Sequence, residues 1–464
     1  MTDWCPDLSS SNAPRYIAIA DSIEADLSAG RLKSGDRLPA QRHLAKLLGL
    51  DFTTVARGYT EARRRGFLSS QVGSGTFVTD PRRDFLQQSV AAGPARECAP
   101  DFSMNLPPEP DTHDLTALMQ ESFARLTADL VPLLRYQNLE ASDQDQTAAA
   151  SWLERVGLAP QAEQILFSPG AQAALSSLLA MLANPGDQVA CEAVTYPGIR
   201  SICAQLHLQL RGLDTDENGI VPEAFEAACR AGNLKVLYLN PTLHNPTTRT
   251  VPYKRRQELV AVARKFGVAI LEDDAYGQLV PSAPLPFSAL APELTWYIGS
   301  LSKSLGAGLR LAYVVAPSRG ASWQFSRAIR TQQVMPSPLT VALATIWIEN
   351  GTASALLEEI RSESAARQVL ASKRFKKLDY LADQNGFHLW LSLPQGWSRS
   401  AFVSQLRNLP IGLVEADAFT VAGAPSEAVR LGLGGPLNRE QLVNALDIVS
   451  QTIEASPAKA SVYF

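Results

Sequence analysis

The residue with the most distinctive chemistry in this sequence is Lys303, which lies in the segment GSLSKSLG at residues 299–306. An amine can attack a carbonyl carbon and form a Schiff base. Ser300 and Ser302 before it, and Arg310 after it, offer hydroxyl and guanidinium donors of the kind that bind a phosphate group. The segment therefore predicts a site where a reactive amine lies beside an anion-binding cradle.

Two other segments place polar side chains directly after apolar, strand-like runs. Asp273 and Tyr276 lie in VAILEDDAY, and carboxylates at the end of a buried strand are costly unless a cation pairs with them. Asn245 lies in NPTLHNPT, where two Asn-Pro steps favour an extended loop. Its amide could donate to a phenolate oxygen, whereas the neighbouring His244 is interpreted as a local hydrogen-bonding residue.

Two weaker signals lie earlier in the chain. Gly170-Ala171-Gln172 opens a helix-like stretch whose free N–H groups could bind an anion, although a simple N-cap is the commoner explanation. Tyr196 follows a strand-like run and could stack on a planar ring or form the edge of a core. Pyridoxal phosphate would use all five segments, because it needs an amine, a carboxylate for its pyridinium nitrogen, a stacking ring and a phosphate cradle.

The order of these segments resembles the fold-type I, class I aminotransferases. The resemblance implies that Lys303 forms the Schiff base with pyridoxal phosphate and that Asp273 pairs with the pyridinium nitrogen. It also implies that Asn245 and Tyr276 bind the phenolate oxygen and that Tyr196 stacks on the ring. The implied phosphate ligands are Gly170, Ala171, Gln172, Ser300, Ser302 and Arg310.

Two further residues take implied roles from the same family. Arg430, in AVRLGLGG, matches the arginine that binds a substrate carboxylate, and its planar fork suits that task, although arginines that start strands are common. Tyr136 matches a tyrosine that reaches the phosphate bound by the partner subunit. The glycine-rich stretch that normally follows this tyrosine is absent, since the sequence reads YQNLE. The substrate entrance is therefore expected to depart from the family pattern.

The elements that must position these residues alternate between helical stretches of 10 to 15 residues and short apolar runs such as KVLYLN, VAILED and LAYVVA. This alternation predicts an α/β fold with a mainly parallel central sheet. Together with the resemblance, it assigns residues 101–464 to an aminotransferase-like domain that binds pyridoxal phosphate, binds an effector and dimerises.

A different pattern occupies residues 1–79. Helical spacing at residues 14–29 is followed by a short helix after Pro39, a third helix with Asp51 as its N-cap, and a hairpin pattern in FLSSQVGSGTFV. This is the plan of a winged helix-turn-helix. The segments GDRLPAQRHLAKLLGL, TTVARGYTEARRRGFL and VGSGTFV together resemble the DNA-binding domain of the GntR family.

Recognition of double-stranded DNA follows from that geometry, because the third helix would enter the major groove. Arg42 matches the family arginine that reads a base and could contact guanine through two hydrogen bonds. Phe52 stands where some members carry an arginine, and we expect it to pack in the core rather than touch a thymine methyl group. The other predicted DNA contacts are Thr53, Thr54, Arg57 and, in the wing, Gly73, Ser74 and Gly75.

The two domains, joined by a predicted linker at residues 80–100 with one short helix, together resemble the MocR subfamily of GntR-type bacterial regulators. The resemblance implies a homodimer, arranged head to tail, that regulates transcription. Its effector would be a small amine, an amino acid or the cofactor itself. Two alternatives stay open: a working aminotransferase that also binds DNA, and a constitutive DNA-binding protein that uses the second domain as a dimer scaffold.

The composition is consistent with these hypotheses and excludes several others. Of 464 residues, 46% are hydrophobic and 19% charged, and the net charge of −4 hides a basic stretch at residues 31–83 with 11 basic and 4 acidic residues. The five cysteines contain no C-x-x-C pair, so we expect neither a disulfide framework nor a metal site. No signal peptide or long apolar run is evident, which predicts a cytoplasmic protein without membrane association.

Overall fold

The computed structural model describes residues 4–6, 8, 13–33, 35–71, 75–79, 101–109, 113–128, 130–137, 141–407 and 411–455. The chain divides into two compact units, Met1–Glu97 and Cys98–Phe464. The predicted linker at residues 80–100, with its short helix, lies outside the described residues. Within the described ranges no helix is both long and apolar enough to cross a membrane.

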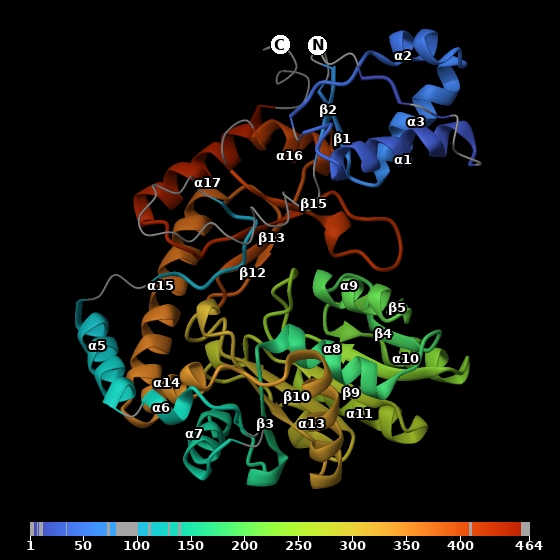
Figure 1. The fold of residues 1–464 in the computed structure, drawn as a ribbon. Coiled ribbons are helices and arrows are strands. Elements are labelled where there is room, and N and C mark those ends of the chain that lie inside the picture. Colours follow the sequence, from blue (N-terminus) through green and yellow to red (C-terminus); the bar gives the residue numbers. More distant parts are fainter. Residues whose placement is uncertain are drawn as a thin grey trace. The chain divides into compact units, whose positions relative to one another are not determined.

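Three helices and a β-hairpin form the first unit, drawn in blue in Figure 1, as the sequence predicts. The strands pair antiparallel, from Leu68 opposite Val78 to Gln71 opposite Gly75. The elements are α1 (Arg15–Ser28), α2 (Gln41–Leu48), α3 (Phe52–Arg64), β1 (Leu68–Gln71) and β2 (Gly75–Val78).

Local sequence signals set the end of α2 and the start of α3. Gly49 follows α2 in the left-handed conformation, with φ 63°, which glycine adopts without strain. Asp51 caps α3 by accepting a hydrogen bond from the backbone N–H of Thr53 at 2.6 Å. Tyr59 of α3 packs with Ile19 of α1 in a single apolar core. Both predicted helix boundaries are confirmed.

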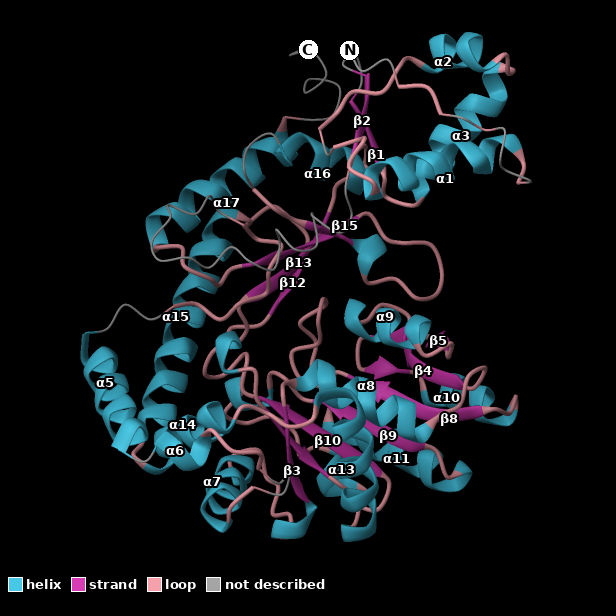
Figure 2. Ribbon diagram, viewed as in Figure 1, coloured by secondary structure: helices cyan, strands magenta, loops and turns pink. Residues whose placement is uncertain are grey.

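The second unit is built on a seven-stranded sheet, drawn in magenta in Figure 2. The strand order is β3-β11-β10-β9-β8-β4-β5, and the pairs are parallel except that β11 runs antiparallel to both of its neighbours. The predicted mainly parallel α/β sheet is therefore confirmed. The strands are β3 (Ile165–Ser168), β4 (Gln188–Glu192), β5 (Gln209–Leu213), β8 (Leu234–Leu239), β9 (Ala269–Asp273), β10 (Thr295–Ser300) and β11 (Ala312–Val315).

Helices cover both faces of this sheet. Three of them share an apolar core with one face, and three others share a second core with the opposite face. Strands buried on both faces read as continuous apolar runs, which explains the segment at residues 234–239. The first set is α8 (Ala171–Leu182), α9 (Pro197–Gln205) and α13 (Arg319–Gln333), and the second is α10 (Pro222–Arg230), α11 (Tyr253–Phe266) and α12 (Phe287–Leu290).

A four-stranded antiparallel sheet, in the order β12-β13-β15-β14, forms the smaller part of the second unit. The long helix α15 (Thr352–Arg374) contacts both α14 near the large sheet and α17 near the small one. The remaining elements are α5 (His113–Ala128), α6 (Leu130–Leu133), α7 (Asp143–Glu154), α14 (Pro338–Glu349), α16 (Arg399–Arg407), α17 (Arg439–Glu454), β6 (Thr215–Asp216), β7 (Gly219–Ile220), β12 (Tyr380–Ala382), β13 (His388–Ser392), β14 (Val414–Glu415) and β15 (Ala428–Gly432).

Candidate functional site

The five segments predicted from the sequence each follow the carboxyl end of a strand in the seven-stranded sheet. These strands run parallel to one another, so the segments lie along the same side of the sheet, where the carboxyl ends are. β3 precedes Gly170, β4 precedes Tyr196, β8 precedes Asn245, β9 ends at Asp273 and β10 leads to Lys303. Ligands bind at this edge in open α/β sheets, because the loops that leave the strands converge there. The fold thus gathers residues that are far apart in the sequence.

Lys303 lies in the turn after β10, and its Nζ donates a hydrogen bond to the backbone carbonyl of Asn105. Its pKa is lowered to about 8, chiefly by burial and further by the positive charges of Arg430 and Arg310, while Asp273 acts in the opposite direction. About a tenth of the amine is therefore unprotonated at pH 7, and this neutral form is the one that attacks a carbonyl carbon.

Asp273 carries a buried carboxylate with one satisfied oxygen. Tyr238 of β8 donates to Oδ2 at 2.8 Å, whereas Oδ1 is buried and lacks a hydrogen-bond partner among the described residues. Burial, together with the neighbouring Asp274, raises the pKa of Asp273 to about 6, against the opposing effects of Tyr238 and Lys303. A buried acceptor of this kind calls for a donor, and a cationic donor stabilises it best.

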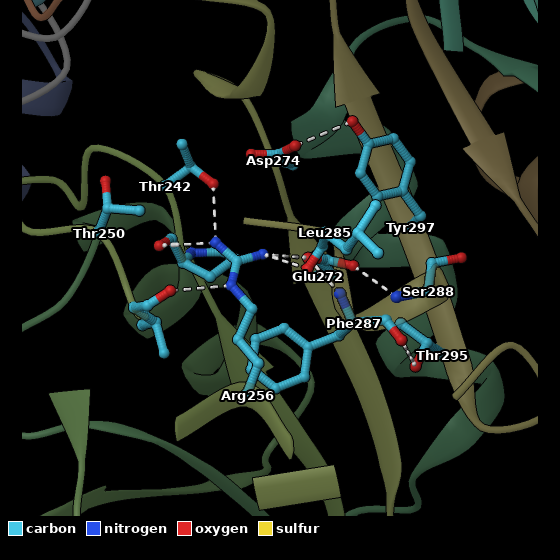
Figure 3. Close-up of polar contacts among 12 residues, drawn as sticks. Thr242, Thr250, Arg256, Glu272, Asp274, Leu285, Phe287, Ser288, Thr295 and Tyr297 are labelled. Carbon is cyan, nitrogen blue, oxygen red and sulfur yellow. Dashed lines mark hydrogen bonds and ion pairs between the residues drawn. The ribbon is translucent and has the colours of Figure 1, made fainter. Parts of the chain in front are cut away.

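The carboxylate before Asp273 is bound inside the protein (Figure 3). Glu272 accepts hydrogen bonds from the backbone N–H groups of Phe287 and Ser288, at 2.9 Å each, and forms an ion pair with Arg256 at 3.5 Å. Both partners of this pair are almost completely buried. Arg256 is the cation that the sequence analysis expected beside these carboxylates but did not identify.

The carboxylate after Asp273 is also bound inside the protein. The Tyr297 hydroxyl donates to Oδ2 of Asp274 at 3.0 Å, as Figure 3 shows, while Arg256 donates to the Thr242 hydroxyl at 3.2 Å. Burial raises the pKa of Asp274, and Arg256 and Tyr297 oppose that rise. Oδ1 of Asp274, like Oδ1 of Asp273, is buried without a hydrogen-bond partner among the described residues, but Asp274 interacts with Arg256, whereas Asp273 interacts with the reactive amine of Lys303.

Arg430 of β15 joins the small sheet to the loop after β8. Its Nη1 donates to Oδ1 of Asn245 at 3.0 Å, and its Nη2 donates to the backbone carbonyl of Ser103. The guanidinium lies 5.1 Å from the centre of the Phe419 ring, and its buried Nε lacks a partner among the described residues. No carboxylate pairs with Arg430 in the described part of the chain. The carboxylate of a ligand would therefore supply the missing opposite charge.

Asn105 connects two of the predicted site residues. Its side-chain amide donates to the Tyr276 hydroxyl at 2.8 Å, and its backbone carbonyl accepts the hydrogen bond from Lys303. The Tyr276 ring also packs against His388, with ring centres 5.6 Å apart. Asn105 thereby fixes both the amine and the hydroxyl in the site.

A small-residue turn and an arginine meet at the start of α8. Gly170 has φ 97°, and a Cβ atom there would lie 3.2 Å from Nη2 of Arg310, so the backbone and the guanidinium approach closely. The helix starts at Ala171, where its first N–H groups lack intrahelical partners. The Ser300 hydroxyl, near the end of β10, accepts from the backbone N–H of Ser302 at 3.2 Å. Backbone N–H groups, a hydroxyl and a guanidinium of this kind are the donors that could bind an anion.

Tyr196 lies at the start of α9, and its hydroxyl contacts Oε1 of Gln172 at 3.3 Å. A Cβ atom on Gly198 would lie 2.2 Å from the Tyr196 ring and 2.8 Å from Gln172, so only glycine allows this ring position. Burial raises the pKa of the Tyr196 hydroxyl, and the charge of Asp273 adds to the rise. Tyr196 at the start of α9 thus contacts Gln172 in the first turn of α8.

This donor set fits pyridoxal phosphate. The unpaired Oδ1 of Asp273 suits a protonated pyridine nitrogen, and the partly neutral amine of Lys303 suits an aldehyde carbon. Arg310 and the N-terminus of α8 suit a phosphate dianion. The described residues thus offer each kind of group that pyridoxal phosphate needs.

Tyr136 makes no contact with the other predicted site residues among the interactions of the described chain. Its side chain is 85% exposed, and it follows α6, whereas the other predicted ligands lie at the edge of the large sheet. The residues 138–140, which follow shortly after it, lie outside the described ranges. A contact of Tyr136 with the cofactor of a partner subunit stays a prediction.

The first unit presents a set of exposed side chains near the N-terminal ends of α2 and α3. Arg42 is exposed, and its guanidinium lies 5.9 Å from the centre of the Phe52 ring. Phe52 is itself 44% exposed. The expectation that Phe52 packs in the core is wrong: α3 enters the apolar core through Val55, Tyr59 and Ala62, and Phe52, at the first position of the helix, lies beyond the end of that core.

The other predicted DNA contacts differ in exposure. Thr53 and Arg57 are exposed, Thr54 is half-buried, and the Arg57 guanidinium lies 4.2 Å from the centre of the Tyr16 ring. Gly75 is the first residue of β2. Gly73 and Ser74 lie outside the described residues.

The three consecutive arginines that end α3 have different partners. Arg64 and Arg65 both form ion pairs with Glu61, and Arg65 also pairs with Asp21. Arg63 is exposed and forms no ion pair in the described part of the chain. Its charge is thus the one least neutralised within the protein.

Comparison with known proteins gives the same two parts. Residues 101–449 match the family described as aminotransferase class I and II, and residues 15–78 match the bacterial regulatory proteins of the gntR family. The chain is 30% identical to the HTH-type transcriptional regulator YdeF of Bacillus subtilis over 455 residues, which cover 97% of each protein.

Two further comparisons concern function and fold. The chain is 28% identical to the vitamin B6 salvage pathway transcriptional repressor PtsJ of Salmonella typhimurium, over 93% of this chain and 96% of that protein. The structure of LysN, an α-aminoadipate aminotransferase from Thermus thermophilus, matches with a TM-score of 0.70 at 22% identity, over 88% of this chain and 100% of the other. This likeness shows the fold.

Proposed function

Since the chain belongs to the aminotransferase class I and II family and carries a GntR-family DNA-binding domain, we propose that it is a transcriptional regulator whose pyridoxal phosphate site senses an amino compound. The pair formed by Lys303 and Asp273 carries the proposal, because it sets a partly neutral amine beside a buried carboxylate oxygen without a partner among the described residues. Bound pyridoxal phosphate supplies an aldehyde that reacts with amines and a ring that withdraws electrons.

The protein residues around this pair bind and orient the ligands. Asp273 would hold the proton on the pyridine nitrogen, and Tyr276 and Asn245 would donate to the phenolate oxygen. Tyr196 would stack on the ring. The phosphate ligands would be Gly170, Ala171, Gln172, Ser300, Ser302 and Arg310.

Arg430 would bind the carboxylate of an effector that carries one. Without such a ligand its Nη1 bonds to Asn245, which follows a strand of the large sheet. A carboxylate that takes over this guanidinium weakens the bond to Asn245 and so changes the contact between the small and large sheets. An effector shifts such an equilibrium only by its different affinity for the two positions.

A head-to-tail homodimer is part of the proposal. Large apolar side chains are exposed on α5, on α6 and just after α6, and exposed apolar patches of this kind are typical of interfaces. A dimer would also place two recognition helices on two half-sites of an operator. The residues concerned are Phe123, Val131, Leu134 and Tyr136, which are 50%, 67%, 69% and 85% exposed.

The effector class follows from the chemistry of the site and from one relative. A primary amine is the group that competes with Lys303 for an aldehyde, so amino acids and other amines are candidates. PtsJ is named for vitamin B6 salvage, so B6 compounds are candidates as well. Residues 80–100 would carry the change to the DNA-binding domain.

The visible absorbance of the purified holo-protein, titrated with amino acids, amines and B6 compounds, tests the proposal. A band that shifts and then persists, without release of a keto acid, is the expected result for a sensor. A band that bleaches while keto acid accumulates would instead establish a working aminotransferase. A spectrum that no compound changes would contradict sensing at Lys303.

A further inference from the structure

A cavity of about 230 Å³ lies in the second unit next to the loop that follows β8. Its walls come from the end of β4, the β6–β7 hairpin, this loop, and the small-sheet strands β12 and β13. None of the residues proposed to hold pyridoxal phosphate lines it. The lining residues that carry the inference are Glu192, His244, Arg249 and Trp390.

Glu192 brings a buried carboxylate without a cationic partner to this cavity. Its side chain is 5% exposed, and the hydroxyl of Thr195 donates to Oε2 at 3.3 Å. No ion pair reaches Glu192 in the described part of the chain, and burial raises its pKa to about 7. An ionised carboxylate in such a place is costly unless a cation joins it.

Arg249 brings the opposite charge to the rim. Its side chain is exposed, and Nη1 donates to the backbone carbonyl of Asp216 at 3.0 Å. The carboxylate of Asp216 is already bound by Arg255 at 2.8 Å, so it does not neutralise Arg249. The buried Nε2 of His244, on the same loop, also lacks a hydrogen-bond partner among the described residues.

We propose that this cavity binds a small zwitterion of amino-acid size, with its ammonium group at Glu192 and its carboxylate at Arg249. The volume is below the roughly 300–1,000 Å³ of sites for drug-sized ligands, which suits a compact metabolite. Trp390 and Leu381 form an apolar wall for a side chain. No lysine is among the described residues that line the cavity. The zwitterion therefore binds there noncovalently, whereas an amine at the cofactor site reacts with the aldehyde held by Lys303.

Binding in this cavity is coupled to the cofactor site by short connections. His244 lines the cavity, and the next residue, Asn245, accepts the hydrogen bond from Arg430. Trp390 lies directly opposite Arg430 in the pairing of β13 with β15, and Nε2 of His388 donates to the carbonyl of His244 at 3.3 Å. A ligand that contacts both sheets favours one position of the small sheet and changes the affinity for an amine at Lys303.

The test uses full-length holo-protein in which sodium borohydride has fixed pyridoxal phosphate to Lys303, so that amines no longer react there. Equilibrium dialysis against each of the twenty radiolabelled amino acids should find saturable binding of at least one, with one site per chain. Glu192→Gln and Arg249→Gln should each weaken this binding at least about tenfold, because each removes a charge-assisted hydrogen bond. The exposed Lys254→Gln is the matched control for lost surface charge and should change nothing.

Two results would overturn the inference. One is the absence of saturable binding for all twenty amino acids. The other is binding that Arg430→Gln abolishes and that Glu192→Gln and Arg249→Gln leave intact, since the ligand would then occupy the cofactor site. Arg249 lies on the surface, so its variant tests the site even if Glu192→Gln fails to fold. The inference rests on the proposed function only for its regulatory role, and the absorbance titration of unreduced protein tests that function separately.

Discussion

The guanidinium of Arg42 and the ring of Phe52 form an exposed pair, 5.9 Å apart, near the N-terminal ends of α2 and α3. A cation–π contact at an exposed site contributes about 0.5–1 kcal/mol, which is enough to favour one arrangement of the two side chains. In a helix-turn-helix, residues at the start of the recognition helix face the base edges. In that arrangement Phe52 would contact an apolar group of a base and Arg42 would contact a polar base edge.

The first prediction is that Phe52 recognises a thymine methyl group. An operator selected from random DNA should contain a thymine at this position, and its replacement by uracil removes one methyl group. Burial of one such group is worth about 0.8 kcal/mol, so wild-type affinity should fall about fourfold. The Phe52→Ala protein should bind both DNAs equally in a fluorescence anisotropy titration. An equal loss with uracil in both proteins would contradict the contact.

The second prediction separates base reading from phosphate binding. Arg42→Ala should cost about 1–3 kcal/mol on the selected operator and should relax the preference at one base pair. Arg63→Ala, which removes an exposed arginine without an ion pair in the described residues, should weaken binding to all sequences alike. Binding measured on a set of single-base operator variants distinguishes the two. A uniform loss for Arg42→Ala would make it a phosphate contact.

The fold could be predicted to a large extent because its signals are local. Asp51 as a cap, Gly49 as a helix end and the apolar runs of the parallel strands each depend on a few neighbouring residues. The order of the segments around Lys303 and Asp273 follows from the strand order. Their convergence at one edge is a consequence of parallel pairing.

What could not be predicted depends on contacts between distant segments. Asn105 meets Tyr276 across 171 positions, and Tyr238 meets Asp273 across 35, with no spacing pattern that joins them. Arg256 lies in a helix rich in charges, where nothing marks it as the buried partner of Glu272. For Phe52 a local signal was present but misleading. An apolar residue type favours burial, whereas the exposed position of Phe52 depends on how other residues pack in the core.

The third prediction concerns the pH dependence of cofactor capture by Lys303. With its pKa lowered to about 8, about a quarter of the amine is neutral at pH 7.5, against about a thousandth for an ordinary lysine of pKa 10.5. The rate at which apo-protein captures pyridoxal phosphate should rise about tenfold per pH unit below pH 7 and level off above pH 8. Stopped-flow absorbance measures it.

A variant gives this prediction its control. The positive charge of Arg430 lowers the pKa of Lys303, so Arg430→Gln should raise that pKa and move the plateau to higher pH. The capture rate at pH 7.5 should fall in the variant, while the rate well above the new pKa should match that of the wild type. A plateau at the same pH in both proteins would show that Arg430 does not set the protonation of Lys303.

The fourth prediction concerns the buried ion pair between Arg256 and Glu272. Removal of one partner from a buried pair leaves an uncompensated charge, so Arg256→Met should cost about 3–5 kcal/mol of stability. Arg264→Gln breaks an exposed pair with Glu293 and should cost less than about 1 kcal/mol. Urea unfolding of both variants, followed by tryptophan fluorescence, gives the comparison.

The pH dependence of the Arg256→Met defect identifies its cause. Burial raises the pKa of Glu272 to about 7, and the nearby Arg256 holds it below the value that burial alone would give. Loss of the arginine therefore raises this pKa further above that of the unfolded chain. A folded-state pKa that is raised contributes stability at low pH, which is lost as the pH rises through it. The variant should thus be close to wild type near pH 5.5 and most destabilised near pH 8. Addition of Glu272→Gln should reduce that pH dependence to the part contributed by Asp274, whose pKa Arg256 also lowers. A defect of equal size at both pH values would point to lost packing in place of the uncompensated carboxylate.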